Sequence, residues 1–240
     1  DQQARAASLQ IVMIGVLLTQ RETIAVELRR PVSGAPASSL AADLRVLRTA
    51  PVLMCFFYFF LLTVALTGIQ TFGVSSLTAL YRIPVTLAST ALTAFLLGGA
   101  GGILTGGWIA TRTSRHDLVA AGGVFATGLL MLLLALGALS AALLVPVLAL
   151  AGFCSGITNP SRDLLVRGAT PRGSIGKVYG FVYSGLDLGS MVTPVFYGWL
   201  LDRGLAQGVF YTAFVALMFT IATVLQLPGQ AKAAQVQPAR

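Results

Sequence analysis

Six long apolar segments dominate the hydrophobic pattern of the chain, at residues 51–71, 87–111, 118–139, 143–159, 178–201 and 206–227. Apolar and polar residues do not alternate in these segments, as they would in the strands of a membrane barrel. Most are near the roughly 20 residues that a helix needs to cross a hydrocarbon core of about 30 Å. The pattern therefore predicts an all-α membrane protein with six transmembrane helices in a lipid bilayer.

Composition argues against several other classes of protein. Only 10% of the residues are charged, against about 25% in soluble proteins. The net charge of +8 lies in loops between apolar segments rather than in a basic patch with aromatic residues, so we expect no nucleic-acid partner. Cys55 and Cys154 are expected to pack as small hydrophobic residues. His116 is the single histidine, and the glycine cluster at residues 98–102 lacks the lysine of a phosphate-binding loop. We therefore expect neither an enzyme nor a metal or cofactor.

The distribution of positive charge predicts the orientation in the membrane. Of the 16 lysine and arginine residues, all but Arg82 and Arg203 fall before the first segment, after an even-numbered segment or in the C-terminal tail. Because positive loops stay in the cytoplasm, both termini are expected there. Arginine greatly outnumbers lysine, which is associated with GC-rich bacterial genomes. We expect a multi-pass protein of a bacterial plasma (inner) membrane.

The flanking regions divide the chain into three parts. Residues 49–228 form the predicted six-helix transmembrane domain, and residues 229–240 a cytoplasmic tail. Residues 9–19 are apolar over too short a stretch to span a bilayer. We therefore expect residues 1–48 to be the remnant of a preceding helix followed by a cytoplasmic linker.

A short sequence repeat suggests inverted topology. GWIATR closes the second segment at residues 107–112, and GWLLDR closes the fifth at residues 198–203, an offset of 91 residues. Because this offset spans three helices, an odd number, the two copies would face opposite sides of the membrane. Two three-helix units of opposite topology are typical of secondary transporters. A chance match of two short Gly-Trp motifs is the alternative.

The loop after the second segment carries a family resemblance. Residues 106–115, GGWIATRTSR, resemble the signature loop of the major facilitator superfamily, approximately G-x-x-x-D-R-x-G-R, with matches at Gly107, Arg112 and Arg115. Thr111 and Ser114 depart from the pattern. In the family the missing acid belongs to a charge network that holds the cytoplasmic side closed, so the resemblance does not extend to that role.

A second stretch, residues 159–189, resembles drug exporters of the fosmidomycin-resistance type. Together the resemblances cover about residues 50–227. They imply that these six helices are the C-terminal half of a twelve-helix facilitator fold, and that the protein exports a small organic solute.

Small residues recur every four positions in two of the predicted helices. Gly98, Gly102 and Gly106 follow this spacing in the second segment, and Gly185 and Gly189 in the fifth. Such ridges let another helix approach closely in lipid. Since the matching helices of facilitator folds contact the other half, we expect the ridges to face a partner outside this chain, either an N-terminal transporter half or a second copy. Packing within the six-helix unit is the alternative.

Asp187 is the strongest candidate for a functional side chain. It lies roughly 14 Å into its predicted helix, where an ionised carboxylate costs about 2.5 to 3.5 kcal/mol and usually faces a cavity or a partner. Desolvation would favour its protonated form. Tyr183 and Ser184 lie one turn earlier and could hydrogen-bond it. We interpret Asp187 as a proton-coupling or cation-recognising carboxylate. The alternative is a carboxyl that hydroxyl groups hold as a link between helices.

Three further polar residues are weaker candidates. Gln70 and Asn159 are expected at the ends of the first and fourth segments, where their amides could line a pathway or simply cap helices. Tyr58 lies in the aromatic stretch CFFYFF, residues 55–60, and could contact substrate, lipid or the core.

These features together predict a secondary transporter that moves a small organic solute by alternating access, with proton-coupled export as the expected mode. A membrane scaffold or degenerate transporter fragment that moves no solute is the alternative.

Overall fold

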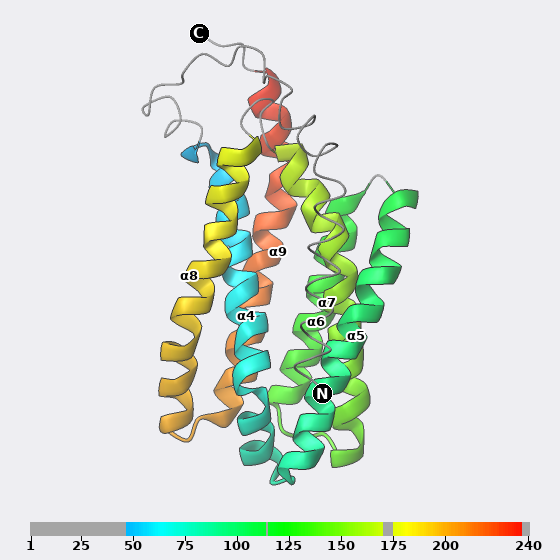
Figure 1. Cartoon of the computed structure of the whole chain (residues 1–240), viewed down its shortest axis with the longest axis vertical. Coiled ribbons are helices and arrows are strands. Elements are labelled where there is room, and N and C mark those ends of the chain that lie inside the picture. Colours follow the sequence, from blue (N-terminus) through cyan, green and yellow to red (C-terminus); the bar gives the residue numbers. More distant parts are fainter. Residues whose placement is uncertain (1–46, 114, 170–174, 237–240) are drawn as a thin grey trace, which may run out of the picture. The chain divides into compact units, whose positions relative to one another are not determined.

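The computed structural model describes residues 47–113, 115–169 and 175–236, and it contains six helices in this part of the chain (Figure 1). They are α4 (Ala50–Tyr81), α5 (Val85–Arg112), α6 (His116–Ala135), α7 (Ala141–Ala169), α8 (Ile175–Asp202) and α9 (Ala206–Val236). The six predicted helices are therefore confirmed. The predicted remnant and linker at residues 1–48 lie outside the described residues apart from the last two positions.

Five of the six helices are long and apolar enough to cross a membrane, and α8 is the one that does not qualify. Its length is sufficient at 28 residues. It fails to qualify because it is too polar: Asp187, Lys177 and several tyrosine, serine and glycine residues interrupt the apolar sequence. This helix is therefore the least suited to full contact with lipid.

Prolines and residues with positive φ explain where several helices begin and end. Pro51 occupies the first turn of α4, where its missing N–H costs nothing. Arg82 ends α4 in the left-handed conformation with φ of 52°, and Pro84 follows as the residue before α5. Gly204 adopts a φ of 72° in the turn after α8, a conformation that glycine accepts without strain.

Three helices continue beyond their predicted ends. α4 reaches Tyr81 rather than residue 71, α7 reaches Ala169 rather than residue 159, and α9 reaches Val236 rather than residue 227. The prediction ended this helix with the apolar segment at residue 159, whereas α7 continues through Pro160. Membrane helices tolerate proline since neighbouring groups can satisfy the freed backbone atoms. The extension of α4 is held by burial of Leu77, which is 1% exposed.

The helices alternate in direction, and their packing follows an inverted repeat (Figure 1). The closest pairs are α5–α7, α4–α8, α4–α9, α6–α7 and α6–α9. Exchanging α4 with α7, α5 with α8 and α6 with α9 converts the α5–α7 pair into α8–α4 and the α6–α7 pair into α9–α4. The α6–α9 pair maps onto itself. The helix contacts thus have the two-fold symmetry expected of two inverted three-helix units.

The helix positions in the sequence support the same repeat. Equivalent helices begin with offsets of 91, 90 and 90 residues, from Ala50 to Ala141, Val85 to Ile175 and His116 to Ala206. A constant offset across three pairs is not explained by a chance match of two short motifs. The predicted fold, half of a major facilitator fold made of two inverted repeats, is confirmed.

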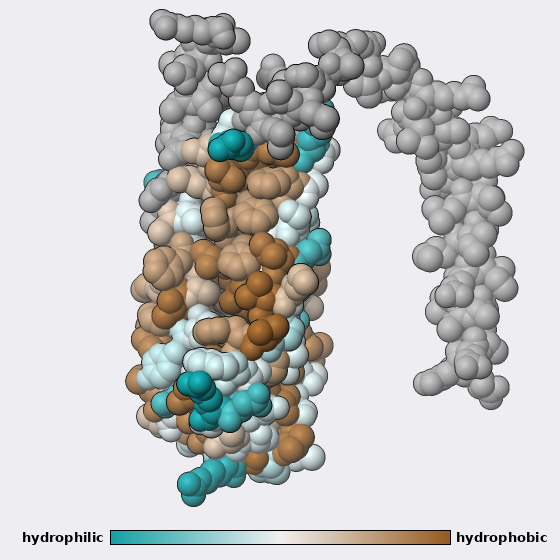
Figure 2. All heavy atoms as spheres, turned by 90° about the vertical axis from the view of Figure 1, so that its left-hand side faces the viewer, coloured by the Kyte–Doolittle hydropathy of each residue, from teal (hydrophilic) through white to brown (hydrophobic). Residues whose placement is uncertain are grey.

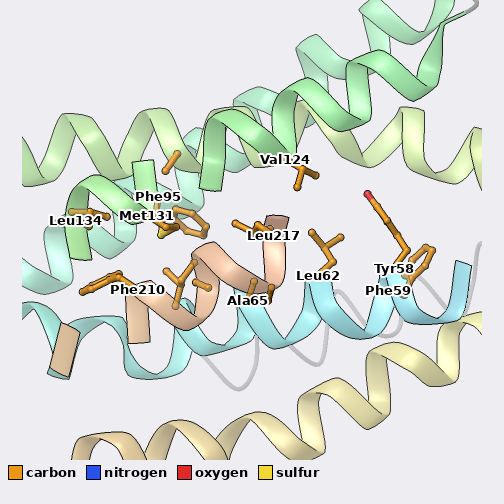
Figure 3. Close-up of a cluster of buried hydrophobic side chains, with 14 of the residues drawn as sticks. Tyr58, Phe59, Leu62, Ala65, Phe95, Val124, Met131, Leu134, Phe210 and Leu217 are labelled. Carbon is orange, nitrogen blue, oxygen red and sulfur yellow. The ribbon is translucent and has the colours of Figure 1, made fainter. Parts of the chain in front are cut away.

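The core lies mainly where α4, α6 and α9 meet (Figure 3). Phe59 of α4, Met131 of α6 and Phe210 of α9 are each fully buried. The outward-facing side chains differ sharply, since Leu104 and Met191 are 77% and 76% exposed. A band of apolar residues crosses the side of the molecule where α8 lies (Figure 2). Apolar residues thus fill the inside and also cover the outside, as expected of helices in a bilayer.

Glycine residues bring the backbones of α5 and α7 together along their length. A Cβ atom added at Gly98 would clash with the carbonyl oxygen of Ala149, one at Gly102 with that of Phe153, and one at Gly106 would lie 2.5 Å from that of Ile157. Gly152 and Gly156 of α7 likewise lie against the backbone of α5. We call this contact the α5–α7 seam. Because lipid gives helices no hydrophobic reason to associate, such van der Waals contact is a principal source of stability.

The glycine pair of α8 packs in the same way against α4. A Cβ atom added at Gly185 would lie 2.7 Å from the carbonyl oxygen of Phe56, and one at Gly189 would lie 2.9 Å from that of Phe60. The expectation that both ridges face a partner outside this chain was therefore wrong. They hold the two repeats to each other, because each ridge meets a helix of the opposite repeat.

The seam predicts a contrast between two glycines of α5. We expect Gly102→Ala to destabilise the protein by about 1 to 3 kcal/mol, because the added methyl group meets rigid backbone atoms. Gly107→Ala is the matched control, since no atom lies within 4 Å of its added Cβ, and alanine favours the helix by about 0.5 to 1 kcal/mol. Thermal unfolding in one detergent compares them, and a rise in both midpoints would contradict the seam.

Candidate functional site

A cavity of about 260 Å³ lies between α4, α5 and α7. It brings together two of the predicted site residues, Gln70 of α4 and Asn159 of α7, and adds Ser155, one turn before Asn159. Phe95 and Leu66 contribute apolar walls. Such a site, with mostly apolar walls and a few polar groups, is typical of small-molecule binding.

Neither Gln70 nor Asn159 caps a helix end. Each lies about 15 Å inside its helix, 11 residues before Tyr81 and 10 residues before Ala169 respectively. The capping interpretation was therefore wrong, because it depended on helices that ended too early. Of the two alternatives, only the location beside a cavity agrees with the structure.

Pro160 adds a backbone acceptor next to this cavity. A proline has no N–H, so the carbonyl group four residues earlier, that of Gly156, loses its usual helical donor. Gly156 itself lines the cavity. The side chains that line the cavity include two amides and a hydroxyl, and none of the lining side chains is charged.

Asp187 lies on the exposed face of α8. It stands about 18 Å from the start of the helix and about 22 Å from its end. Gly180, Ser184, Met191 and Val195 share this exposed face at helical spacing. Within the described residues the carboxylate has no hydrogen bond or ion pair. The Ser184 hydroxyl donates instead to the carbonyl oxygen of Phe181 at 2.6 Å.

Tyr183 turns away from Asp187 and joins an aromatic cluster. Its ring stacks on Tyr179 with centroids 5.8 Å apart and lies 5.2 Å from the ring of Phe59 on α4. The guanidinium carbon of Arg162 on α7 lies 4.8 Å from the centroid of Phe59, on the face of that ring. The hydroxyl group of Tyr179 donates to the carbonyl oxygen of Asp163 at 3.5 Å, which connects α8 back to α7.

We call Arg162, Phe59, Tyr183 and Tyr179 the aromatic clasp, because they link α7, α4 and α8. Among the described residues, α7 and α8 are not one of the helix pairs with substantial contact. The Arg162 side chain is only 17% exposed, and its Nε donates to Asp163 at 3.1 Å. A nearby acid and an aromatic face reduce the cost of holding this cation away from water.

Tyr58 is a core residue beside the clasp. It is 2% exposed, and its side chain points from α4 toward the neighbouring helices (Figure 3). Its hydroxyl group is buried with no hydrogen-bond partner among the described residues, as is that of Ser161. A lipid-facing position for Tyr58 is therefore wrong.

The signature-loop residues lie where α5 meets α6. Arg112 is the last residue of α5, and Arg115 immediately precedes α6. Gly107 lies in α5 with open space around it. Thr111, which replaces the expected acid, donates its hydroxyl to the carbonyl oxygen of Trp108 at 2.8 Å. Arg112 lies over the ring of Trp108 rather than beside an acid.

Fold and site together define a helical membrane protein of two inverted repeats, with a mostly apolar cavity that carries a few polar groups between helices. The family model of the Major Facilitator Superfamily matches residues 53–239, and the chain belongs to this superfamily of membrane transporters. A search among curated proteins gives no match. In the described part of the chain, no three histidine, cysteine, aspartate or glutamate side chains gather to hold a metal ion.

Two important residues were missed by reasoning from the sequence. Ser155 precedes Asn159 by four residues, and this helical spacing could have identified it. Arg162 was assigned to the loop after the fourth apolar segment, which was expected to end at residue 159. Its position within α7 depends on the continuation of the helix, which no local signal in the sequence indicates.

The aromatic clasp predicts energetic coupling between Phe59 and Arg162. In a double-mutant cycle of Phe59→Leu and Arg162→Met, we expect a coupling energy of about 0.5 to 2 kcal/mol, from the loss of a desolvated cation–π contact. Phe57→Leu with Arg162→Met is the control cycle, since Phe57 is 52% exposed. Equal coupling in the two cycles, measured by reversible unfolding in detergent, would refute the clasp.

Proposed function

We propose that this chain forms one half of a secondary transporter that moves a small organic solute by alternating access. A second six-helix half, from the same polypeptide or from a second copy of the chain, would complete the pathway. The observation that carries this proposal is the position of Asp187, which lies in the middle of the exposed face of α8 and has no partner among the described residues. Facing lipid it would cost about 2.5 to 3.5 kcal/mol. Facing a water-filled pathway it would cost far less.

In this proposal Asp187 carries the coupled proton, and the cavity beside Gln70, Ser155 and Asn159 holds the solute. The uncharged polar lining suits a solute with amide, carbonyl or hydroxyl groups on an apolar body. Proton-coupled export is the expected direction, and the resemblance of residues 159–189 to drug exporters supports it. The open sides of α5 and α8, where Leu104 and Val195 are more than 70% exposed, leave apolar surface for a second half or lipid.

Neutralising Asp187 should separate coupling from binding. In vesicles that contain the complete natural polypeptide, we expect Asp187→Asn to slow proton-gradient-driven movement of ethidium or carboxyfluorescein by about tenfold or more, since an amide cannot carry the proton. Exchange of the dye without a gradient should persist. Asp202→Asn, at the end of the same helix, is the control and should leave both rates unchanged.

The same assay tests the cavity. We expect Asn159→Leu to raise the KM for the transported dye by about tenfold, because a polar group of the solute would lose its partner. If Asp187→Asn kept the full gradient-driven rate, this result would contradict the proposed coupling role of Asp187. If the natural protein moved neither dye, the result would favour the scaffold alternative.

We also propose that the end of the bundle with the α5–α6 connection faces the cytoplasm. Arg112 and Arg115 lie at this end. Most lysine and arginine residues of the chain fall in connections on the same side, and positively charged loops stay in the cytoplasm. The turn between α8 and α9, which carries Arg203, would lie outside.

Labelling of single cysteines tests this orientation. In intact cells, a membrane-impermeant maleimide should label a cysteine introduced by Gly204→Cys, and it should label one introduced by Thr113→Cys only after the cells are opened. The reverse pattern would invert the proposed topology. Cys55 and Cys154 are first replaced by serine to remove the natural thiols.

A further inference from the structure

The two tryptophans of the chain occupy the same position in the two copies of the repeated motif. Trp108 lies four residues before Arg112, and Trp199 lies four residues before Arg203. In each copy the guanidinium group of the arginine lies over the indole ring, with distances to the ring centroid of 4.1 Å and 4.4 Å. Both are within the roughly 6 Å range of a cation–π interaction.

We propose that these two Trp–Arg pairs are binding sites for the phosphate of an anionic phospholipid headgroup, one in each leaflet. The indole rings of Trp108 and Trp199 are 58% and 47% exposed. Both arginines are exposed as well. Each pair therefore presents an apolar ring and a cationic group at the surface of the six-helix unit, a combination suited to the boundary between hydrocarbon and headgroups.

The placement of the two pairs matches the thickness of a bilayer. Arg112 ends α5 and Arg203 directly follows α8, and these helix ends lie at opposite ends of the bundle (Figure 1). Each helix has 28 residues, which corresponds to about 42 Å. A bilayer with its headgroups measures about 40 to 45 Å. The pairs thus lie at the depth of the two headgroup layers.

No protein anion in the described structure pairs with either arginine. Thr111 replaces the acid that would precede Arg112. Asp202 directly precedes Arg203 but forms no ion pair with it in the described structure. The planar guanidinium group can bind two phosphate oxygens at once, and stacking on the indole fixes its plane. A lipid phosphate supplies the missing negative charge.

Lipid-selective quenching of tryptophan fluorescence tests this proposal without any transported solute. Trp199→Phe leaves Trp108 as the single tryptophan. With the protein in phosphatidylcholine vesicles, we compare quenching by a small fraction of brominated phosphatidylglycerol with quenching by the same fraction of brominated phosphatidylcholine. We expect about fivefold enrichment of the anionic lipid beside Trp108, the preference that one arginine near an anionic lipid supports.

Substitution of the arginine provides the decisive comparison. Arg112→Gln should abolish the enrichment. Arg115→Gln removes an equal charge that stacks on no aromatic ring in the described structure, and it should retain most of the enrichment. For the other leaflet, Trp108→Phe isolates Trp199, and Arg203→Gln should abolish its enrichment.

Three results would overturn the proposal. Equal enrichment in Arg112→Gln would show that the arginine does not bind lipid. Absence of quenching by either brominated lipid would show that protein, such as a second transporter half, covers the indole. Displacement of brominated phosphatidylglycerol by millimolar inorganic phosphate would identify a site for the free ion instead. Transport can fail in any variant without affecting these readings, so this test is separate from that of the proposed function.

Discussion

Close contact between helix backbones across the two repeats is the constraint on which this structure depends. In lipid, apolar side chains gain little by leaving their surroundings, so helices associate through packing and hydrogen bonds. Glycines on α5 and α7 let the two backbones meet along the seam, and Gly185 and Gly189 do the same for α8 on α4. Since each contact joins helices of opposite repeats, the seam forms only when both repeats are folded. The cavity beside Gln70 and Asn159 exists because this seam fixes α5 and α7 next to α4.

Properties that repeat along the chain could be predicted from the sequence. Six apolar segments gave six helices, because a bilayer requires each spanning segment to satisfy its own backbone hydrogen bonds. The two Gly-Trp motifs indicated the inverted repeat, and the constant offset of the helix starts supports it. The glycine spacing correctly predicted close helix packing, but the expected partner, a helix outside this chain, was wrong. Spacing shows that a face can be approached closely, whereas the identity of the approaching helix is a tertiary property.

The candidate site was harder to predict, because it depends on where α7 ends. The fourth apolar segment was expected to end at residue 159, which placed Asn159 in a helix and Arg162 in the following loop. In the structure both belong to one helix, and both lie near α4 through different contacts, one at the cavity and the other at the ring of Phe59. The aromatic clasp involves three helices that are far apart in sequence. No spacing rule within one helix can predict such an arrangement, since it follows from how the repeats pack.

The two repeats differ at equivalent positions of α5 and α8, both in how closely the helix packs and in where the acid lies. At the α5–α7 seam, Gly106 meets the backbone of Ile157 directly. Its equivalent on α8, 91 residues later, is Tyr197, whose ring fills the space where a side chain at Gly68 of α4 would lie. The equivalent of Asp187 on α5 is Leu96, which is apolar and half exposed. α5 is thus tightly packed and apolar, while α8 contacts α4 less closely and carries Asp187, an acid with no partner among the described residues. A helix held less tightly can move against its neighbours with a smaller loss of contact than one packed along its whole length.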